Sequence, residues 1–125
     1  MDGSLPEEMS LLTEMHSLLL PQNRLQDYLP SSFGVMPILT YIDLNNNHLR
    51  GVPSEMAEMT GLKFLSLNQN DFTGTLPTLI CELTSISSLS FQQNWLTGTL
   101  PTCIGNLVAL TGLGLTQNFL TGSIP

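Results

Sequence analysis

Apolar and polar residues alternate in short runs that recur along the whole chain. One such run is "LKFLSLNQN", residues 62–70, in which a single serine separates Leu65 from Leu67. Strict alternation of this kind predicts a short β-strand with one buried face. Similar runs recur at intervals of 23 or 24 residues, so the same strand is expected in each interval. The equivalent apolar positions are Leu18, Leu20, Ile42, Leu44, Leu65, Leu67, Leu89, Phe91, Leu113 and Leu115.

Each run leads to a proline that is followed by two apolar residues three positions apart. In one interval these residues are Pro77, Ile80 and Leu83, and Gly74 precedes them. The glycine permits a backbone turn that a Cβ atom would strain, and the proline fixes φ and stops regular strand pairing. A spacing of three places both apolar residues on one helical turn. The interval therefore predicts a strand, a turn and a short helical turn.

An asparagine recurs at the end of each predicted strand, at Asn23, Asn47, Asn70, Asn94 and Asn118. Its amide can turn inward and bond backbone groups that the strand leaves free, so the stacked residues predict a structural asparagine ladder. Aligned on this residue, the chain divides into units 15–38, 39–61, 62–85 and 86–109, with partial units 1–14 and 110–125. Unit 39–61 has lost one residue between Gly51 and Pro53. Because one unit cannot bury its apolar residues alone, we expect a single stacked array over residues 1–125.

The repeated pattern, with its "TGTLP" and "TGSIP" phrases, resembles the leucine-rich repeat, specifically the plant-type subclass of about 24 residues. The resemblance extends from Gly3 to Pro125. It implies an α/β fold, a curved right-handed solenoid with parallel strands on the concave face and short helical turns on the convex side. In this subclass a further short strand segment runs near the Gly-x-Leu-Pro phrase.

Plant-type repeats form the ectodomains of receptor-like kinases and receptor-like proteins, and also secreted inhibitors of cell-wall-degrading enzymes. The resemblance implies a non-catalytic module that binds a protein, peptide or glycan on its concave face, outside the cell. The sequence shows no signal peptide, no membrane span and no capping units, and it starts and stops within a unit. We therefore expect a fragment of a larger cell-surface receptor-like protein. The alternatives are a stand-alone enzyme inhibitor or scaffold, and a non-functional truncated gene product.

Exposed strand positions supply the candidate partner-binding residues. Aromatic side chains recur at two of these positions, and such residues often anchor interfaces. An alternative for Trp95 and Phe119 is that they merely pack on the strand ends. Ser66, Ser90, Asn68, Gln92 and their neighbours are expected to be small exposed polar groups, suited to hydrogen bonds with a ligand or simply to a soluble face. The candidates are Tyr41, Phe64, Trp95 and Phe119, with Asp43, Lys63, Asp71 and Gln93 around them.

The charges are few and unevenly distributed. The net charge is −7, and the three cations are Arg24, Arg50 and Lys63. So few basic groups argue against nucleic acid as a partner. Eight of the ten acidic residues lie at or before Glu58, and no charged residue lies between Leu83 and Pro125.

The remaining chemistry-bearing residues form no recognisable catalytic or metal site. His16 and His48 fall at different positions of neighbouring units, away from cysteines or carboxylates at metal-ligand spacing. No nucleophile motif or phosphate-cradling loop is present, so we expect no enzyme, no cofactor and no metal. Cys81 fills a small-residue position, and Cys103 lies at a variable, outward position. The two cysteines are therefore expected to point in different directions and to remain unpaired.

Overall fold

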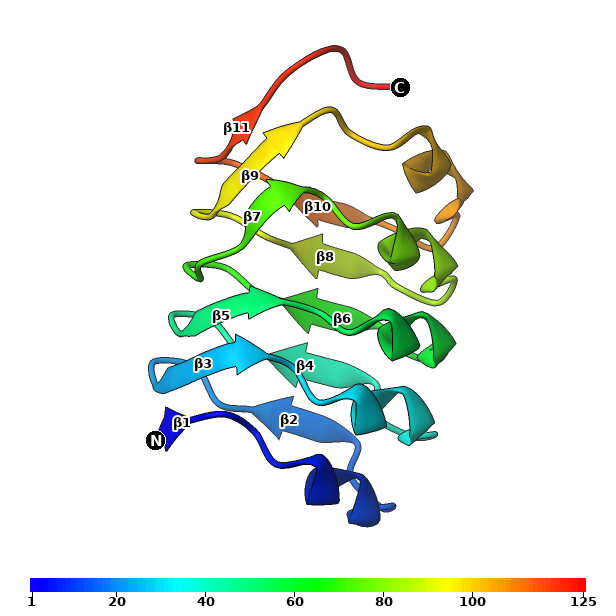
Figure 1. Ribbon diagram of the computed structural model, residues 1–125. Coiled ribbons are helices and arrows are strands. Elements are labelled where there is room, and N and C mark those ends of the chain that lie inside the picture. Colours follow the sequence, from blue (N-terminus) through cyan, green and yellow to red (C-terminus); the bar gives the residue numbers. More distant parts are fainter.

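The computed structural model describes residues 1–125 as one solenoid of stacked coils (Figure 1). In each complete coil a first strand leads through a tight turn into a second strand, and a 3-10 helix precedes the return to the next coil. The predicted parallel strands and short helical turns are thus confirmed. In Figure 1 the first strands lie behind the second strands, and the helices form a separate column beside both.

The first strands form one parallel sheet, here called the main sheet. Its order is β10-β8-β6-β4-β2, so each coil pairs with the coil before and after it. Equivalent positions of the repeat stand directly opposite each other, as Ile42 does with Leu65 and Leu65 with Leu89. These three side chains are buried, because the alternating pattern turns every second residue inward. The strands are β2 (Ser17–Leu19), β4 (Tyr41–Asp43), β6 (Phe64–Ser66), β8 (Ser88–Ser90) and β10 (Gly112–Gly114).

The second strands form two smaller parallel sheets, of orders β1-β3-β5 and β11-β9-β7, here called the side sheets. Their pairing is staggered, so that Thr73 stands opposite Trp95, 22 residues away. The two sheets are separated between β5 and β7, at the unit that is one residue short between Gly51 and Pro53. The side strands are β1 (Asp2–Gly3), β3 (Arg24–Tyr28), β5 (His48–Gly51), β7 (Thr73–Thr75), β9 (Trp95–Gly98) and β11 (Phe119–Leu120).

The glycine position of the repeat has a positive φ in the regular coils. Gly74 and Gly98 have φ values of 73° and 76°. Asp27 holds the same position with φ 65°, a conformation that costs a non-glycine residue conformational free energy. Gly51, in the shortened unit, does not adopt a positive φ. The missing residue therefore changes the backbone path of this coil as well as the pairing of its side strand.

A proline stands at the N-cap of every 3-10 helix, as Pro77 does for η4. Its fixed φ ends the strand and starts the helix. The two apolar residues after it turn toward the core, where Ile80 and Leu83 are at most 1% exposed. The helices are η1 (Glu7–Leu11), η2 (Ser31–Val35), η3 (Ser54–Glu58), η4 (Thr78–Glu82) and η5 (Thr102–Asn106).

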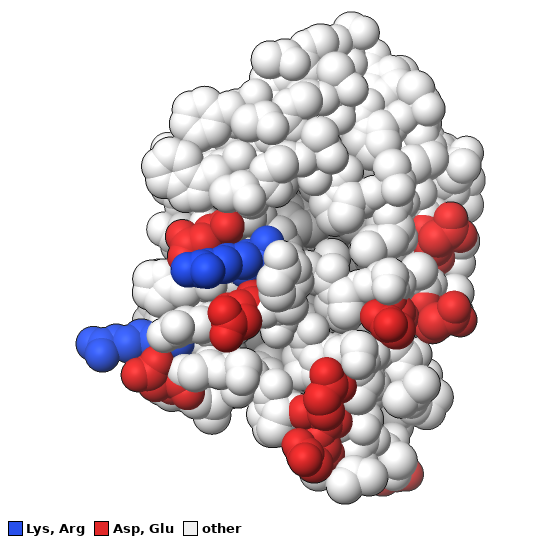
Figure 2. Space-filling model, in the orientation of Figure 1, with Lys and Arg blue, Asp and Glu red and all other residues white.

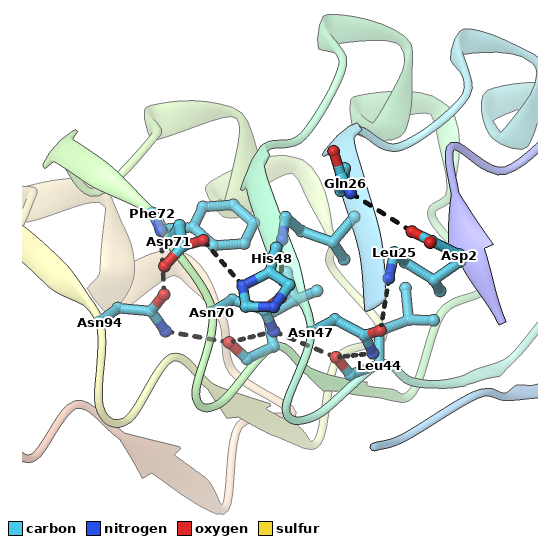
Figure 3. A network of polar contacts seen from close by, with 12 residues as sticks. Asp2, Leu25, Gln26, Leu44, Asn47, His48, Asn70, Asp71, Phe72 and Asn94 are labelled. Atoms are coloured by element: carbon cyan, nitrogen blue, oxygen red, sulfur yellow. Dashed lines mark hydrogen bonds and ion pairs between the residues drawn. The ribbon is translucent and has the colours of Figure 1, made fainter. Parts of the chain in front are cut away.

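The recurring asparagines join adjacent coils beneath the turns (Figure 3). Asn70 Nδ2 donates to the carbonyl oxygens of Leu67 in its own coil and Leu44 in the preceding coil, at 3.2 and 3.0 Å. Its Oδ1 accepts the Leu49 N–H at 2.9 Å. One side chain thus satisfies the buried Leu49 N–H, and it shares the Leu44 and Leu67 carbonyl oxygens with the ladder asparagines of the neighbouring coils. The same inward arrangement occurs at Asn47, Asn94 and Asn118.

Cys81 and Cys103 form a disulfide, so the expectation that they remain unpaired is wrong. Cys81 lies in η4 and Cys103 in η5, with their Cα atoms 5.8 Å apart. The expectation failed because stacking brings these two helix positions of successive coils against each other. Gly34 and Glu55 occupy the same two positions earlier in the array, where a Cβ on Gly34 would clash with the Glu55 carbonyl oxygen.

Glu7 in η1 caps the helix η2 of the next coil. Its Oε2 accepts the Ser32 N–H at 2.8 Å, and its Oε1 accepts the Ser31 N–H at 3.1 Å. The hydrogen bonds from Ser32, above all the backbone one, hold the pKa of Glu7 below its ordinary value of 4.5. Because the pKa is lower in the folded than in the unfolded chain, the ionised carboxylate stabilises the fold at neutral pH. That contribution is lost as the pH falls through the lowered pKa.

Replacing Glu7 with glutamine is expected to lower the melting temperature slightly at pH 7 and to have no effect at strongly acid pH. In acid the wild-type carboxyl group is itself protonated, so both chains then lack the charge. Thermal melts followed by circular dichroism across this pH range measure the difference. Glu8→Gln is the matched control, because Glu8 makes none of these hydrogen bonds. Identical pH profiles for the two variants would contradict the prediction.

Candidate functional site

Two aromatic side chains stack on the outer face of the main sheet. Tyr41 begins β4, Phe64 begins β6, and the register places them directly opposite each other. Their ring centroids are 4.1 Å apart and the ring planes differ by 3°. Tyr41 is 36% exposed and Phe64 is half-buried. Ser88 and Gly112 hold the same position in the next two coils, so only small groups adjoin the far side of Phe64.

Asp43 and Lys63 flank this stacked pair in different ways. Asp43 is half-buried, and its Oδ1 accepts the Asn45 N–H at 3.2 Å within the turn that follows β4. Lys63 is exposed immediately before Phe64. Its ammonium group takes part in no ion pair. The face therefore carries two stacked aromatic rings and one free cation beside them.

A row of amide and hydroxyl groups crosses the same face. Asn45 Oδ1 accepts the Ser66 hydroxyl at 2.5 Å, and Asn68 Oδ1 accepts the Ser90 hydroxyl at 2.6 Å. Asn68 Oδ1 also accepts the Gln92 N–H at 2.8 Å. The expectation that these groups are exposed is wrong for Ser66, which is only 2% exposed. Because successive coils satisfy each other's polar side chains here, much of this row is already engaged within the protein.

The other two predicted aromatic residues lie on the side sheet. Trp95 begins β9 and Phe119 begins β11. Their ring centroids are 5.8 Å apart, their planes differ by 15°, and each side chain is 57% exposed. The rings therefore pack on each other at the strand ends while more than half of each remains accessible.

His48, Asp71 and Trp95 occupy the same repeat position in three successive coils. Asp71 faces His48 of the preceding coil. His48 Nδ1 lies 3.2 Å from Asp71 Oδ2 (Figure 3). The sequence reasoning did not identify this contact. The signal was available, because both residues occupy one column of the repeat and stacked columns become neighbours in space.

A left-handed residue precedes every ladder asparagine, which the sequence reasoning also missed. Gln93 has φ 55° and Gln117 has φ 57°. The turn between the first and second strands requires this conformation, and an amide side chain occupies the position in every complete coil. Its members are Gln22, Asn46, Gln69, Gln93 and Gln117. Gln93 and Gln117 are exposed and line a surface hollow together with Trp95 and Phe119.

The eight predicted partner-binding residues thus fall into two separate groups. Tyr41, Asp43, Lys63 and Phe64 lie on the main sheet, whereas Asp71, Gln93, Trp95 and Phe119 lie on the side strands and their turns. The charged side chains are also unevenly distributed along the solenoid. In Figure 2 the charged side chains lie over the N-terminal and middle coils, and the C-terminal end shown at the top carries none.

No group of three or more His, Cys, Asp or Glu residues is arranged to hold a metal ion. None of the helices has the length and apolar character needed to cross a bilayer.

Two family models match the chain, and both are described as leucine rich repeat. One matches residues 13–72 and the other matches residues 85–107. Receptor-like protein 31 of Arabidopsis thaliana is 34% identical over 79 residues, which are 61% of this chain and 9% of that protein. The chain therefore spans less than a tenth of the length of this relative.

Solved structures of plant receptors have the same fold. The crystal structure of a TDR receptor has a TM-score of 0.93 and 36% sequence identity, covering 99% of this chain and 22% of the receptor chain. The plant peptide hormone receptor RGFR1 in complex with RGF2 has a TM-score of 0.91 and 36% identity, covering 99% and 20% respectively. This chain corresponds to about a fifth of each receptor structure.

Proposed function

The chain belongs to the leucine-rich repeat family, and from this premise we propose that it is a non-catalytic ligand-binding segment of an extracellular receptor-like protein. Its fold and sequence resemble plant receptor ectodomains, which is consistent with ligand or protein binding. The proposed ligand is a protein or peptide that lies across the outer face of the main sheet, the face expected to be concave.

The observation that carries this proposal is the stacked pair Tyr41–Phe64. Its rings lie at 4.1 Å on the outer face, away from the continuous apolar core beneath the sheet. Aromatic side chains of this kind supply large contact area at low conformational cost, and they are enriched among residues that dominate binding energy. Lys63 beside them provides a cation for an acidic or carboxyl group of the ligand.

The Cys81–Cys103 disulfide supports the extracellular part of the proposal. Disulfides persist mainly in oxidising compartments, and cytosolic thiols are usually kept reduced. A receptor-like relative and receptor ectodomain structures point to the same location. A secreted enzyme inhibitor would share these features and differs in its partner, which would be a folded enzyme instead of a peptide.

The experiment is selection of a random peptide library on the purified, oxidised chain. We expect selected peptides to bind the double variant Tyr41→Ala/Phe64→Ala at least about tenfold more weakly, the loss typical of truncated aromatic anchors. Isothermal titration calorimetry with the selected synthetic peptides measures the dissociation constants.

Trp95→Ala/Phe119→Ala is the matched control, since it removes an equal number of stacked rings from the side strands. It is expected to leave peptide binding unchanged. Failure of the library to enrich any binder, or an equal loss in both double variants, would count against the main-sheet face as the binding surface.

A further inference from the structure

A hollow on the side face is lined by the same three consecutive positions from two adjacent coils. Its residues are Gln93, Asn94, Trp95, Gln117, Asn118 and Phe119. The asparagine amides already bond backbone groups of the ladder. The two glutamines and the two aromatic rings are exposed. The hollow therefore offers each chemical group twice, once per coil.

The aromatic rings of this hollow are offset from each other. A centroid separation of 5.8 Å at a plane angle of 15° is an offset stack, in which part of each ring face is left uncovered. An uncovered ring face attracts the C–H groups on the apolar side of a pyranose ring. The flanking Gln93 and Gln117 amides can both donate and accept hydrogen bonds, as sugar hydroxyl groups require.

Threonine hydroxyls continue this surface along the side strands. The register places Thr73 opposite Trp95, and Thr97 opposite Phe119. Thr97 and Thr121 each donate a hydrogen bond, at 3.3 Å, to the carbonyl oxygen of the glycine in the preceding coil. These exposed side chains are thus held in place, and their oxygen atoms retain the capacity to accept a further hydrogen bond.

The hollow between Trp95 and Phe119 contains no charged residue, which constrains its partner. No charged residue lies between Leu83 and Pro125, so both coils of the hollow lack charge entirely. Arg50 and Asp71 line a neighbouring hollow that Trp95 shares, and Asp71 faces His48. An anionic polymer would find no cation within the Trp95–Phe119 hollow, and a basic segment would find no carboxylate there. A neutral ligand that bonds through hydroxyl groups matches it.

We propose that the Trp95–Phe119 face binds an extended, neutral β-linked glycan. Parallel strands are about 4.8 Å apart, so the ring, amide and hydroxyl groups repeat at that interval along the solenoid. The hexoses of an extended β-linked chain repeat at a comparable interval, so successive sugars meet successive coils. This surface is distinct from the Tyr41–Phe64 face, and its occupancy is independent of a ligand there.

Trp95 is the sole tryptophan of the chain, so its fluorescence reports directly on this surface. Titration of the whole chain with cellohexaose, a neutral β-linked glucan, is expected to change the tryptophan emission saturably. In Phe119→Ala, which retains the tryptophan, the dissociation constant is expected to rise about tenfold or more. Loss of the response in Gln93→Gly/Gln117→Gly, which removes the amides and tolerates the left-handed backbone of both positions, would show that the amides take part.

Tyr41→Ala/Phe64→Ala serves as the control and is expected to bind cellohexaose as the wild type does. A similar titration with an oligogalacturonate, an anionic glycan, is expected to give no response. The proposal is overturned if cellohexaose leaves the emission unchanged, if Phe119→Ala binds as well as the wild type, or if the anionic glycan binds equally. Because the peptide experiment uses the other face, each proposal can fail without the other.

Discussion

Replacing Asn94 with alanine is expected to lower the free energy of unfolding by about 2–3 kcal/mol, because it leaves the buried Phe72 N–H without a partner. It also removes one of the two asparagine donors that each of the Leu67 and Phe91 carbonyl oxygens has, the other being Asn70 or Asn118. Asn94 Nδ2 donates to the carbonyl oxygens of Leu67 and Phe91, and its Oδ1 accepts the Phe72 N–H at 3.0 Å. The side chain is only 4% exposed, so water cannot replace these bonds. Urea unfolding followed by circular dichroism measures the change.

Asn106→Ala is the control for this substitution, because Asn106 is an exposed residue at the end of η5. Its replacement is expected to change stability by less than about 0.5 kcal/mol. If Asn94→Ala lowered the free energy of unfolding no more than Asn106→Ala, the asparagine ladder would not be a stabilising feature of the fold.

Removing the Cys81–Cys103 bond is expected to destabilise the chain by about 3 kcal/mol, the value that loop-closure entropy gives for a loop of this size. The two cysteines are 22 residues apart and link consecutive 3-10 helices. Reducing the wild-type protein is expected to lower the urea midpoint. The double substitution Cys81→Ala/Cys103→Ala is expected to lower it as well.

Comparing these two treatments separates the crosslink from packing. Cys81 is 7% exposed, so its truncation to alanine also removes buried contacts, whereas reduction preserves the sulfur atom. A larger loss in the variant than in the reduced protein measures that packing contribution. An unchanged urea midpoint after complete reduction would rule out a stabilising role for the bond.

The repeat pattern predicts the main sheet well because each of its positions has a local physical cause. Leu65 and Leu67 alternate with Ser66, Pro77 fixes the start of a helix, and Gly74 allows a left-handed turn. Once the units stack, equivalent positions must become neighbours. This rule alone places Tyr41 against Phe64.

The other contacts depend on how far each coil is shifted along the strand direction relative to the next coil. The length of the repeat does not specify this shift. On the main sheet Tyr41 and its partner Phe64 hold the same column, but on the side strands Thr73 pairs with Trp95, at 22 residues. Cys81 and Cys103 have this same separation. Aligning the repeats column by column puts the two cysteines in different columns, so the alignment does not reveal the disulfide.

The eight candidate binding residues lie on two different faces for a related reason. Sequence columns record which positions are exposed but not which face of the solenoid they occupy. Phe64 begins a main strand and Trp95 begins a side strand, so the turn between these strand types carries them to different faces. The single group of aromatic residues in the sequence therefore corresponds to two surfaces, one beside Lys63 and one with the uncharged Trp95–Phe119 hollow.

The residue missing between Gly51 and Pro53 also affects how the array unfolds. A solenoid behaves approximately as a one-dimensional row of units, each coupled only to its neighbours. The side-strand ladder is absent between β5 and β7. The coupling there comes from the main sheet, the asparagine ladder and the packed core, with one backbone hydrogen bond from Asp71 to Leu49 and the His48–Asp71 contact. The next interface is instead crosslinked by the disulfide. We therefore expect the array to unfold as two cooperative blocks, with amide hydrogen exchange changing from one protection level to another at this junction.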